Sequence, residues 1–145
     1  MGVRILDVGQ CGFDHAAITG FLQHIVSAHV DAANTAQEAE KLLQQNQYNL
    51  VLVNRILDRD HSSGIDLIKH LRQNPNCPPL MLVSNLPDAQ AKAVAAGALQ
   101  GFGKATIHLP QVAEHLRAVL VAGEDRQEIG ANDKKTFLPE SGVHG

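Results

Sequence analysis

Short apolar runs alternate along the chain with longer segments in which apolar residues recur at helical spacing. The most apolar of the short runs is Leu50–Val53, and the polar residue Asn54 follows it directly. Four aliphatic residues in succession are typical of a strand that is buried on both faces of a parallel sheet. Runs of this kind predict five strands, at residues 3–8, 29–33, 49–54, 80–84 and 99–104.

The intervening segments predict five helices, at residues 14–27, 35–43, 65–71, 87–96 and 110–121. Asp14 and Thr35 have side chains that suit helix N-caps, and Glu38 completes a capping-box pattern with Thr35. Gly97 suits the position just after the end of a helix. Strands and helices that alternate in this way predict an α/β fold. We expect a flavodoxin-like (βα)5 three-layer sandwich, in which helices cover both faces of a five-stranded parallel sheet.

The composition limits the number of domains and the classes of partner. In a chain of 145 residues we expect one domain over residues 1–121, followed by a polar, disordered tail over residues 122–145. A net charge of −3 provides no basic surface for nucleic acid. No apolar run approaches the roughly 20 residues of a membrane helix, and the first residues do not form an export signal. We therefore expect a cytoplasmic protein whose two cysteines, Cys11 and Cys77, are reduced thiols.

The ends of the predicted strands hold the residues that bear on function. Gly9-Gln10 follow the first strand, Asn54 ends the third, Ser84 ends the fourth and Lys104 lies at the end of the fifth. Chemistry in open α/β sheets gathers just beyond the carboxyl ends of the strands. Together with the order and lengths of the elements, these residues resemble the receiver domain of bacterial response regulators, the CheY-like family, over about residues 3–121. The resemblance implies a role in two-component or phosphorelay signal transduction.

The resemblance also implies a phosphorylation site, but its central residues are replaced. In active receivers a carboxylate at the end of the third strand takes a phosphoryl group from a phosphohistidine, and that position is Asn54 here. The acidic pair that normally holds Mg²⁺ corresponds to Gly9 and Gln10. Ser84 and Lys104 keep the residue types that the family has at these two positions.

Further departures lie around the fifth strand and the loop after the third. Ala105 stands where the family has a proline, and Gly101 stands where it has an aromatic switch residue. Phe102 is one place later, so strand alternation directs it to the other face of the sheet. The loop from Asn54 to Gly64 is longer than is usual in the family.

These replacements remove the chemistry that an aspartyl phosphate needs. A carboxylate is the nucleophile in that reaction, and the neutral amide of Asn54 is a poor substitute. Mg²⁺ prefers oxygen ligands that include carboxylates, whereas Gly9 has no side chain and Gln10 has one neutral oxygen. Without the ion, the charge on a transferred phosphoryl group is not neutralised. We therefore expect a pseudo-receiver, in which the fold is kept and the phosphotransfer chemistry is lost. We expect that it is not an enzyme, that it does not bind Mg²⁺ tightly and that it has no other cofactor.

Two alternative functions remain open at the level of the sequence. Asp58 or Asp60, in the loop after Asn54, could replace the missing phosphoacceptor of an active receiver; the simpler interpretation is a solvated loop. A small flavodoxin-like flavin protein is the second alternative, although Gly9-Gln10-Cys11-Gly12 lacks a phosphate-binding signature. The eight histidines are scattered without metal-ligand spacing, and we expect surface or half-buried imidazoles.

The remaining charged residues lead to expectations about pairing and partners. Asp7 lies inside the first strand, where a buried carboxylate needs a partner, and Lys104 is one candidate. A protein partner is expected, either a histidine kinase or another signalling protein. The expected contact surface combines the Ala-rich fourth helix, the fifth strand and the fifth helix, and it could also support a homodimer.

Overall fold

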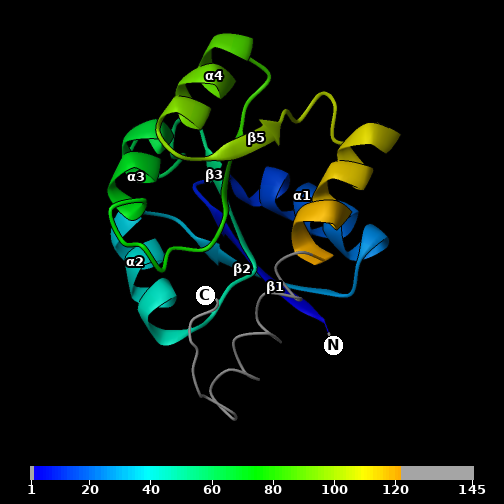
Figure 1. Ribbon diagram of the computed structural model, residues 1–145, viewed down its shortest axis with the longest axis horizontal. Helices are drawn as coiled ribbons and strands as arrows, with labels where there is room; N and C mark the ends of the chain where they lie inside the picture. Colours follow the sequence, from blue (N-terminus) through cyan, green and yellow to red (C-terminus); the bar gives the residue numbers. More distant parts are fainter. Residues whose placement is uncertain (1, 122–145) are drawn as a thin grey trace, which may run out of the picture.

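The computed structural model describes residues 2–121, and the predicted tail over residues 122–145 lies outside them. Nine elements alternate along the chain: β1 (Val3–Val8), α1 (Gly12–Ile25), β2 (Ala28–Ala33), α2 (Ala36–Gln45), β3 (Leu50–Asn54), α3 (Gly64–Leu71), β4 (Leu80–Val83), α4 (Pro87–Ala95) and β5 (Leu99–Phe102). A last helix follows over residues 110–121. The five strands are all parallel, in the order β2-β1-β3-β4-β5. The predicted (βα)5 fold is therefore confirmed (Figure 1).

Helices cover both faces of the sheet, because successive side chains of each buried strand point to opposite faces. Leu6 and Val8 of β1 belong to the core beneath α2, α3 and α4. Ile5 of the same strand belongs to the core beneath α1 and the last helix. Figure 1 shows the two groups of helices on opposite sides of the sheet. Leu50, Val51, Leu52 and Val53 of β3 are fully buried, as the continuous apolar run predicts.

The predicted helix ends are correct at some positions and wrong at others. Thr35 caps α2 by accepting a hydrogen bond from the backbone N–H of Glu38, at 3.2 Å. Asp14 does not cap α1, since the helix begins at Gly12 and the N-cap is Cys11. The carboxylate of Asp14 instead lies in the first turn, where a negative charge is favourable at the positive end of the helix.

Strand β5 ends at Phe102, two residues earlier than the pattern predicts. Between the pairs Met81–Leu99 and Val83–Phe102, β5 contains one residue more than β4, so the ladder has an irregularity. Lys104 therefore lies in the loop after the strand, and the apolar pattern alone gave no sign of this. Phe102 is buried in the core beneath α1, on the face predicted for it.

Two further findings concern the membrane and the cysteines. No helix within residues 2–121 has the length and apolar character that a membrane crossing requires. Cys11 and Cys77 are both free and half-buried. The predicted site residues lie at the carboxyl edge of the sheet, in or next to the loops after β1, β3, β4 and β5.

Candidate functional site

Asn54 is the last residue of β3, and backbone groups hold its side chain in place. The Nδ2 group donates to the carbonyl oxygen of Gly9 at 3.1 Å, and Oδ1 accepts from the backbone N–H of Arg55 at 3.1 Å. The structure thus brings together two of the predicted site positions, 9 and 54. Both polar atoms of the Asn54 amide have partners within the loops, so the amide closes the end of the sheet.

Gly9 is needed at its position for two reasons. Its φ of +84° is favourable for glycine, and a Cβ there would collide with the side chain of Leu57. Its carbonyl oxygen also accepts from the backbone N–H of Asp58 at 2.9 Å. Gly9 thereby joins the loop after β1 to the loop after β3. The sequence marks Gly9 only as a metal position without a side chain and does not predict this role.

Gln10, at the second metal position, is buried, with 6% of its surface exposed. Within residues 2–121, neither Oε1 nor Nε2 has a hydrogen-bond partner. The amide lies close enough to Asp7 to lower its pKa slightly, without reaching hydrogen-bonding geometry. The Gln10 side chain therefore adds a neutral dipole, not a charge, beside the one buried carboxylate of this edge.

Asp7 is that carboxylate, and its partner is His15 of α1. Nδ1 of His15 lies 2.7 Å from Oδ2 of Asp7, whose side chain is fully buried, while Oδ1 of Asp7 has no partner. Burial raises the pKa of Asp7 to about 6 from its ordinary 3.8, and the hydrogen bond and charge of His15 oppose part of this rise. Lys104, one candidate partner for Asp7, is therefore not its partner.

The sequence contained a usable signal for His15. In α1, His15 precedes the buried residues Ile18 and Leu22 by three and seven positions, which is the spacing of one helix face. An ionisable side chain on the buried face of a helix, opposite a carboxylate inside a strand, predicts a pair. The interpretation of the histidines as scattered surface groups missed this contact, although His15 is indeed half-buried.

Lys104 pairs with Asp14, not with Asp7. Its Nζ donates to Oδ2 of Asp14 at 2.7 Å, and the hydrogen bond from Lys104 is the main cause of a lowered pKa of Asp14. Both side chains are partly exposed. The contact joins the loop after β5 to the first turn of α1, so the cation that the family keeps near the phosphoryl group already has an anionic partner.

Ser84 follows β4 and satisfies its own loop. Its Oγ accepts from the backbone N–H of Leu86 at 3.1 Å, and its backbone N–H donates to the carbonyl of Phe102 at 2.9 Å. The hydroxyl therefore helps to position the start of α4, whose N-cap Leu86 has no capping side chain of its own.

Asp58 and Asp60 are exposed in the loop after β3. Oδ1 of Asp60 accepts from the backbone N–H and the hydroxyl of Ser62, at 3.0 and 2.7 Å, and these bonds lower the pKa of Asp60. His61, between Asp60 and Ser62, has a φ of +60°, which fits a tight turn. Within residues 2–121, no group of three or more His, Cys, Asp or Glu side chains has an arrangement that could hold a metal ion.

Solved structures with the same arrangement of elements are signalling receivers. NtrX from Brucella abortus is 17% identical with a TM-score of 0.73; the alignment covers 97% of this chain and 32% of NtrX. The signal receiver domain of a DNA-binding response regulator from Colwellia psychrerythraea is 19% identical, with a TM-score of 0.67 over 81% of this chain and 98% of that one. The chemotaxis response regulator CheY4 of Vibrio cholerae is 16% identical, with a TM-score of 0.65 over 82% and 99%.

The chain has the receiver fold. No protein-family model and no curated protein matches the sequence. The chain spans about a third of the length of NtrX, but nearly all of the two shorter receivers. On this fold, the side-chain amide of Asn54 at the end of β3 is bonded to backbone, Asp7 is paired with His15, and Asp14 is paired with Lys104.

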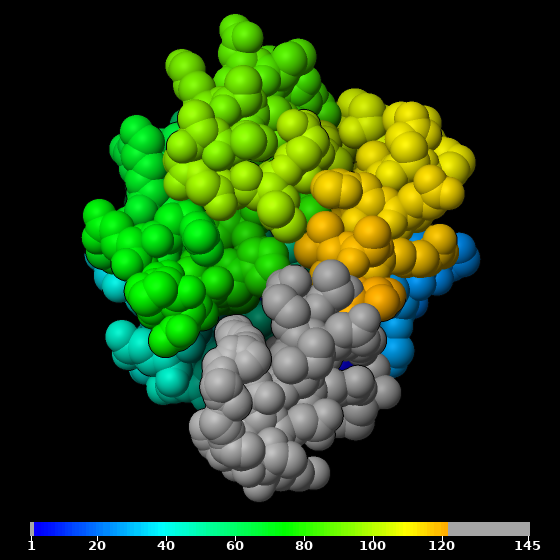
Figure 2. Space-filling view, viewed as in Figure 1, coloured from blue at the N-terminus to red at the C-terminus, as the bar shows by residue number. Residues whose placement is uncertain are grey.

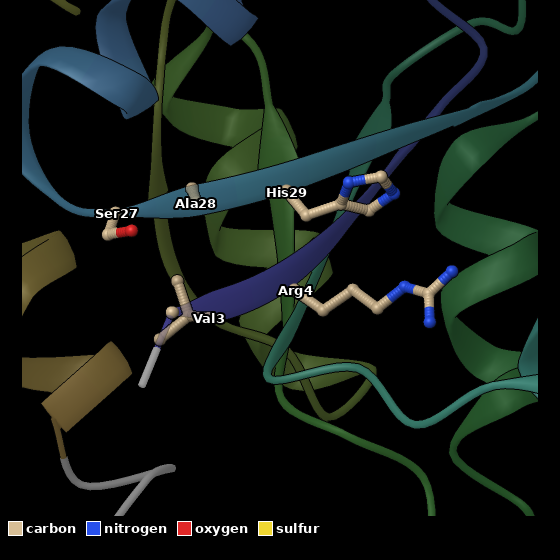
Figure 3. A pocket seen from close by; sticks show the side chains of 6 residues that line it. Val3, Arg4, Ser27, Ala28 and His29 are labelled. Carbon is tan, nitrogen blue, oxygen red and sulfur yellow. The ribbon is translucent and has the colours of Figure 1, made fainter.

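A shallow depression lies at the opposite, amino edge of the sheet, where β1 and β2 begin. Its lining residues are Gly2, Val3, Arg4, Ser27, Ala28 and His29. Arg4 and His29 are neighbours across the two strands and extend to the same side (Figure 3). Both contact the carboxylate of Asp31, at 3.1 and 2.8 Å, and so does the hydroxyl of Tyr48. These polar groups satisfy one another, and through Asp31 they join Arg4 of β1 and Tyr48 to strand β2.

Proposed function

We propose that this chain is a receiver-like signalling domain that takes no aspartyl phosphate and acts through protein contacts. The observation that carries the proposal is the Asn54 amide, whose two polar atoms are bonded to Gly9 and Arg55 at the position of the phosphoacceptor. The neutral amide is a poor nucleophile, and its oxygen carries no charge to attract a metal ion. The proposal includes a role in two-component signalling without enzymatic activity.

The charges around Asn54 support the same conclusion. A phosphoryl group and Mg²⁺ need carboxylates for the ion and a free cation for the phosphate. Here Asp7 is buried and bonded to His15, and Lys104 is bonded to Asp14. Binding a phosphoryl group through Lys104 would require breaking its contact with Asp14, and this would release one carboxylate, whereas the family uses an acidic pair and a carboxylate phosphoacceptor. We therefore propose that Mg²⁺ does not bind tightly at this edge.

Contacts with a protein partner are proposed for the surface formed by α4, β5 and the last helix, here called the α4–β5 surface. Three large apolar side chains on α4, its N-cap and β5 are exposed: Leu86, Val94 and Leu99. The backbone of β5 also joins the last helix, because His115 contacts the carbonyl of Gln100 at 2.7 Å. Figure 2 shows α4, in green to yellow-green, and the last helix, in yellow to orange, on one face of the molecule. A histidine kinase, another signalling protein or a second copy could bind there.

A cytoplasmic location is part of the proposal, and the two free cysteines support it, since reducing compartments keep thiols unpaired. The flavin alternative is not favoured. The solved structures with this fold are receivers, and the carboxylate of Asp14 lies in the first turn of α1, where a cofactor phosphate would have to bind.

Incubation of the purified protein with acetyl phosphate and Mg²⁺, followed by mass spectrometry, tests the proposal. We expect no added phosphoryl group, because the neutral Asn54 provides no nucleophile. An active receiver treated in parallel shows that the reagent works. The variant with both Asp58→Asn and Asp60→Asn is the matched control for the alternative acceptors.

A mass gain of one phosphoryl group that hydroxylamine removes would contradict the proposal. If the gain disappeared in the Asp58→Asn, Asp60→Asn variant, the chain would be an active receiver with a displaced acceptor. Titration calorimetry with Mg²⁺ provides a second measurement, in which tight binding would contradict the expected loss of the metal site.

A further inference from the structure

Gln90 is a buried polar residue on α4, with 7% of its surface exposed, and it lies where the β4–β5 ladder is irregular. Its Nε2 group donates to the carbonyl of Leu82 at 2.9 Å and to that of Ser84 at 3.0 Å. Its Oε1 accepts from the backbone N–H of Gly101 at 3.0 Å. One side-chain amide from the helix thus supplies donors to β4 and its loop, and an acceptor to β5.

The Gln90 amide substitutes for a peptide group in the ladder. The extra residue in β5 shifts the register between Met81 and Val83, so the N–H of Gly101 bonds to a side chain instead of the neighbouring strand. Buried N–H groups without a partner are rare because each costs about 1–3 kcal/mol. The irregular strand pair therefore needs an amide from outside the sheet, and Gln90 provides it.

Gly101 leaves the room that this arrangement requires. A Cβ at position 101 would collide with the carbonyl oxygen of Leu82 and would also press against Oε1 of Gln90. The space between α4 and β5 is therefore filled by the glutamine side chain and by backbone. Residue 101 of β5 therefore cannot carry a side chain without displacing Gln90 or the backbone of β4.

A second polar side chain joins the neighbouring loops. Oδ1 of Asn85, just before α4, accepts from the backbone N–H of Ala105 at 3.0 Å. A Cβ at Gly103 would collide with the same side chain, so the two loops lie in direct contact. The start of α4 is thus bonded to the segment after β5, and the middle of α4 is bonded to β5 itself.

We propose that Gln90 is a positioning residue that holds the α4–β5 surface in a single conformation, in which Leu86, Val94 and Leu99 are permanently exposed for a protein partner. The inference rests on the proposed function, because it concerns the regulation of the surface assigned there. Nε2 of Gln90 also donates to the carbonyl of Phe102 at 3.4 Å. Movement of α4 away from the sheet would break all four hydrogen bonds of the Gln90 amide and leave backbone groups of both strands without that partner. The surface is therefore formed without any signal at the carboxyl edge of the sheet.

Amide hydrogen exchange and NMR relaxation dispersion on the full chain test this role. In Gln90→Ala the exchange of the Gly101 N–H should become at least tenfold faster, and α4 and β5 amides should show exchange on the microsecond-to-millisecond timescale that the unmodified chain does not show. Gln90→Met retains the length of the side chain without its hydrogen bonds and should behave in the same way. Lys92→Ala, an exposed change on the same helix, is the control and should alter neither measurement.

Exchange rates at Gly101 within twofold of the unmodified chain in both Gln90 variants would overturn the proposal. If both variants fail to fold, hydrogen exchange of the unmodified chain tests the proposal. At low concentrations of denaturant the amides of Gly101 and central α4 should open together, and separate opening would refute the positioning role of Gln90. Neither measurement uses phosphate or Mg²⁺. If the positioning role of Gln90 is refuted, the proposed loss of phosphorylation is unaffected. If phosphorylation is detected, the exchange measurements still test the role of Gln90.

Discussion

The buried Asp7 makes a specific prediction about stability and pH. Its folded-state pKa of about 6 exceeds the ordinary 3.8, so the folded protein binds this proton more tightly than the unfolded chain does. Ionisation of Asp7 therefore destabilises the folded state, and the stabilisation present below about pH 4 is lost as the pH rises through about 6. At about 1.4 kcal/mol for each tenfold change in proton affinity, the loss amounts to about 3 kcal/mol.

The substitution Asp7→Asn removes this ionisation and retains an oxygen that can accept from His15. The new amide N–H₂ would also face the side chain of Gln10, whose oxygen lacks a partner. We expect the variant and the unmodified chain to be similarly stable near pH 4 and the variant to be more stable near pH 8, by up to about 3 kcal/mol. The size of the effect follows from burial, which outweighs the opposing contact with His15.

Urea unfolding at several pH values between these limits measures the difference. Asp58→Asn, a change of the same chemistry in an exposed loop, is the control and should produce a difference that varies little with pH. A constant difference between Asp7→Asn and the unmodified chain would refute the reasoning. An unmodified chain that gains stability over the variant as the pH rises would show that the ionised Asp7–His15 pair is stabilising, contrary to the burial argument.

Three further predictions concern the single tyrosine and two glycines. Burial and the neighbouring Asp31 carboxylate raise the pKa of Tyr48 to about 12, so an absorbance titration of the folded protein at about pH 11 should show roughly a tenth of the phenolate that urea-unfolded chain shows; equal phenolate in the two samples would contradict the buried contact. Gly20→Ala should stabilise the protein by about 1 kcal/mol, because Gly20 lies in α1 with open space around it. Gly64→Ala should destabilise it by about 1–3 kcal/mol, since the new Cβ would collide with the Asn54 carbonyl. Thermal unfolding compares the two variants, and shifts of the same sign would show that the close approach at Gly64 has no energetic effect.

The strands were predictable because a buried strand requires a short run of apolar residues, which is visible in the sequence. The run Leu50–Val53 is apolar at every position, which is what a strand covered on both faces requires, and the structure buries all four residues. The position of Asn54 at the carboxyl edge follows directly from where the run ends. The absence of carboxylates at positions 9 and 10 is likewise a property of the sequence, so most of the candidate site could be located before the structure was known.

The pairings could not be predicted, because they depend on contacts between distant segments. Lys104 lies beyond β5, not within it, and it contacts Asp14 in the first turn of α1, which begins at Gly12, two residues before the position that the capping pattern indicated. Gln90 looks like an ordinary polar residue in an Ala-rich helix. Its burial depends on an extra residue in a strand about ten positions later, and no helical pattern contains that information.

The bond between the Asn54 amide and the Gly9 carbonyl has a consequence for any attempt to restore phosphorylation. Asn54→Asp alone would replace the N–H donor of Nδ2 by a carboxylate oxygen. This oxygen would lie about 3 Å from the carbonyl oxygen of Gly9, and two acceptors at that distance repel each other. The same carbonyl oxygen also binds the N–H of Asp58, so it cannot turn away without opening the loop after β3. By this reasoning a functional acceptor at position 54 would require coordinated changes in two loops, and we expect that Asn54→Asp alone does not provide one.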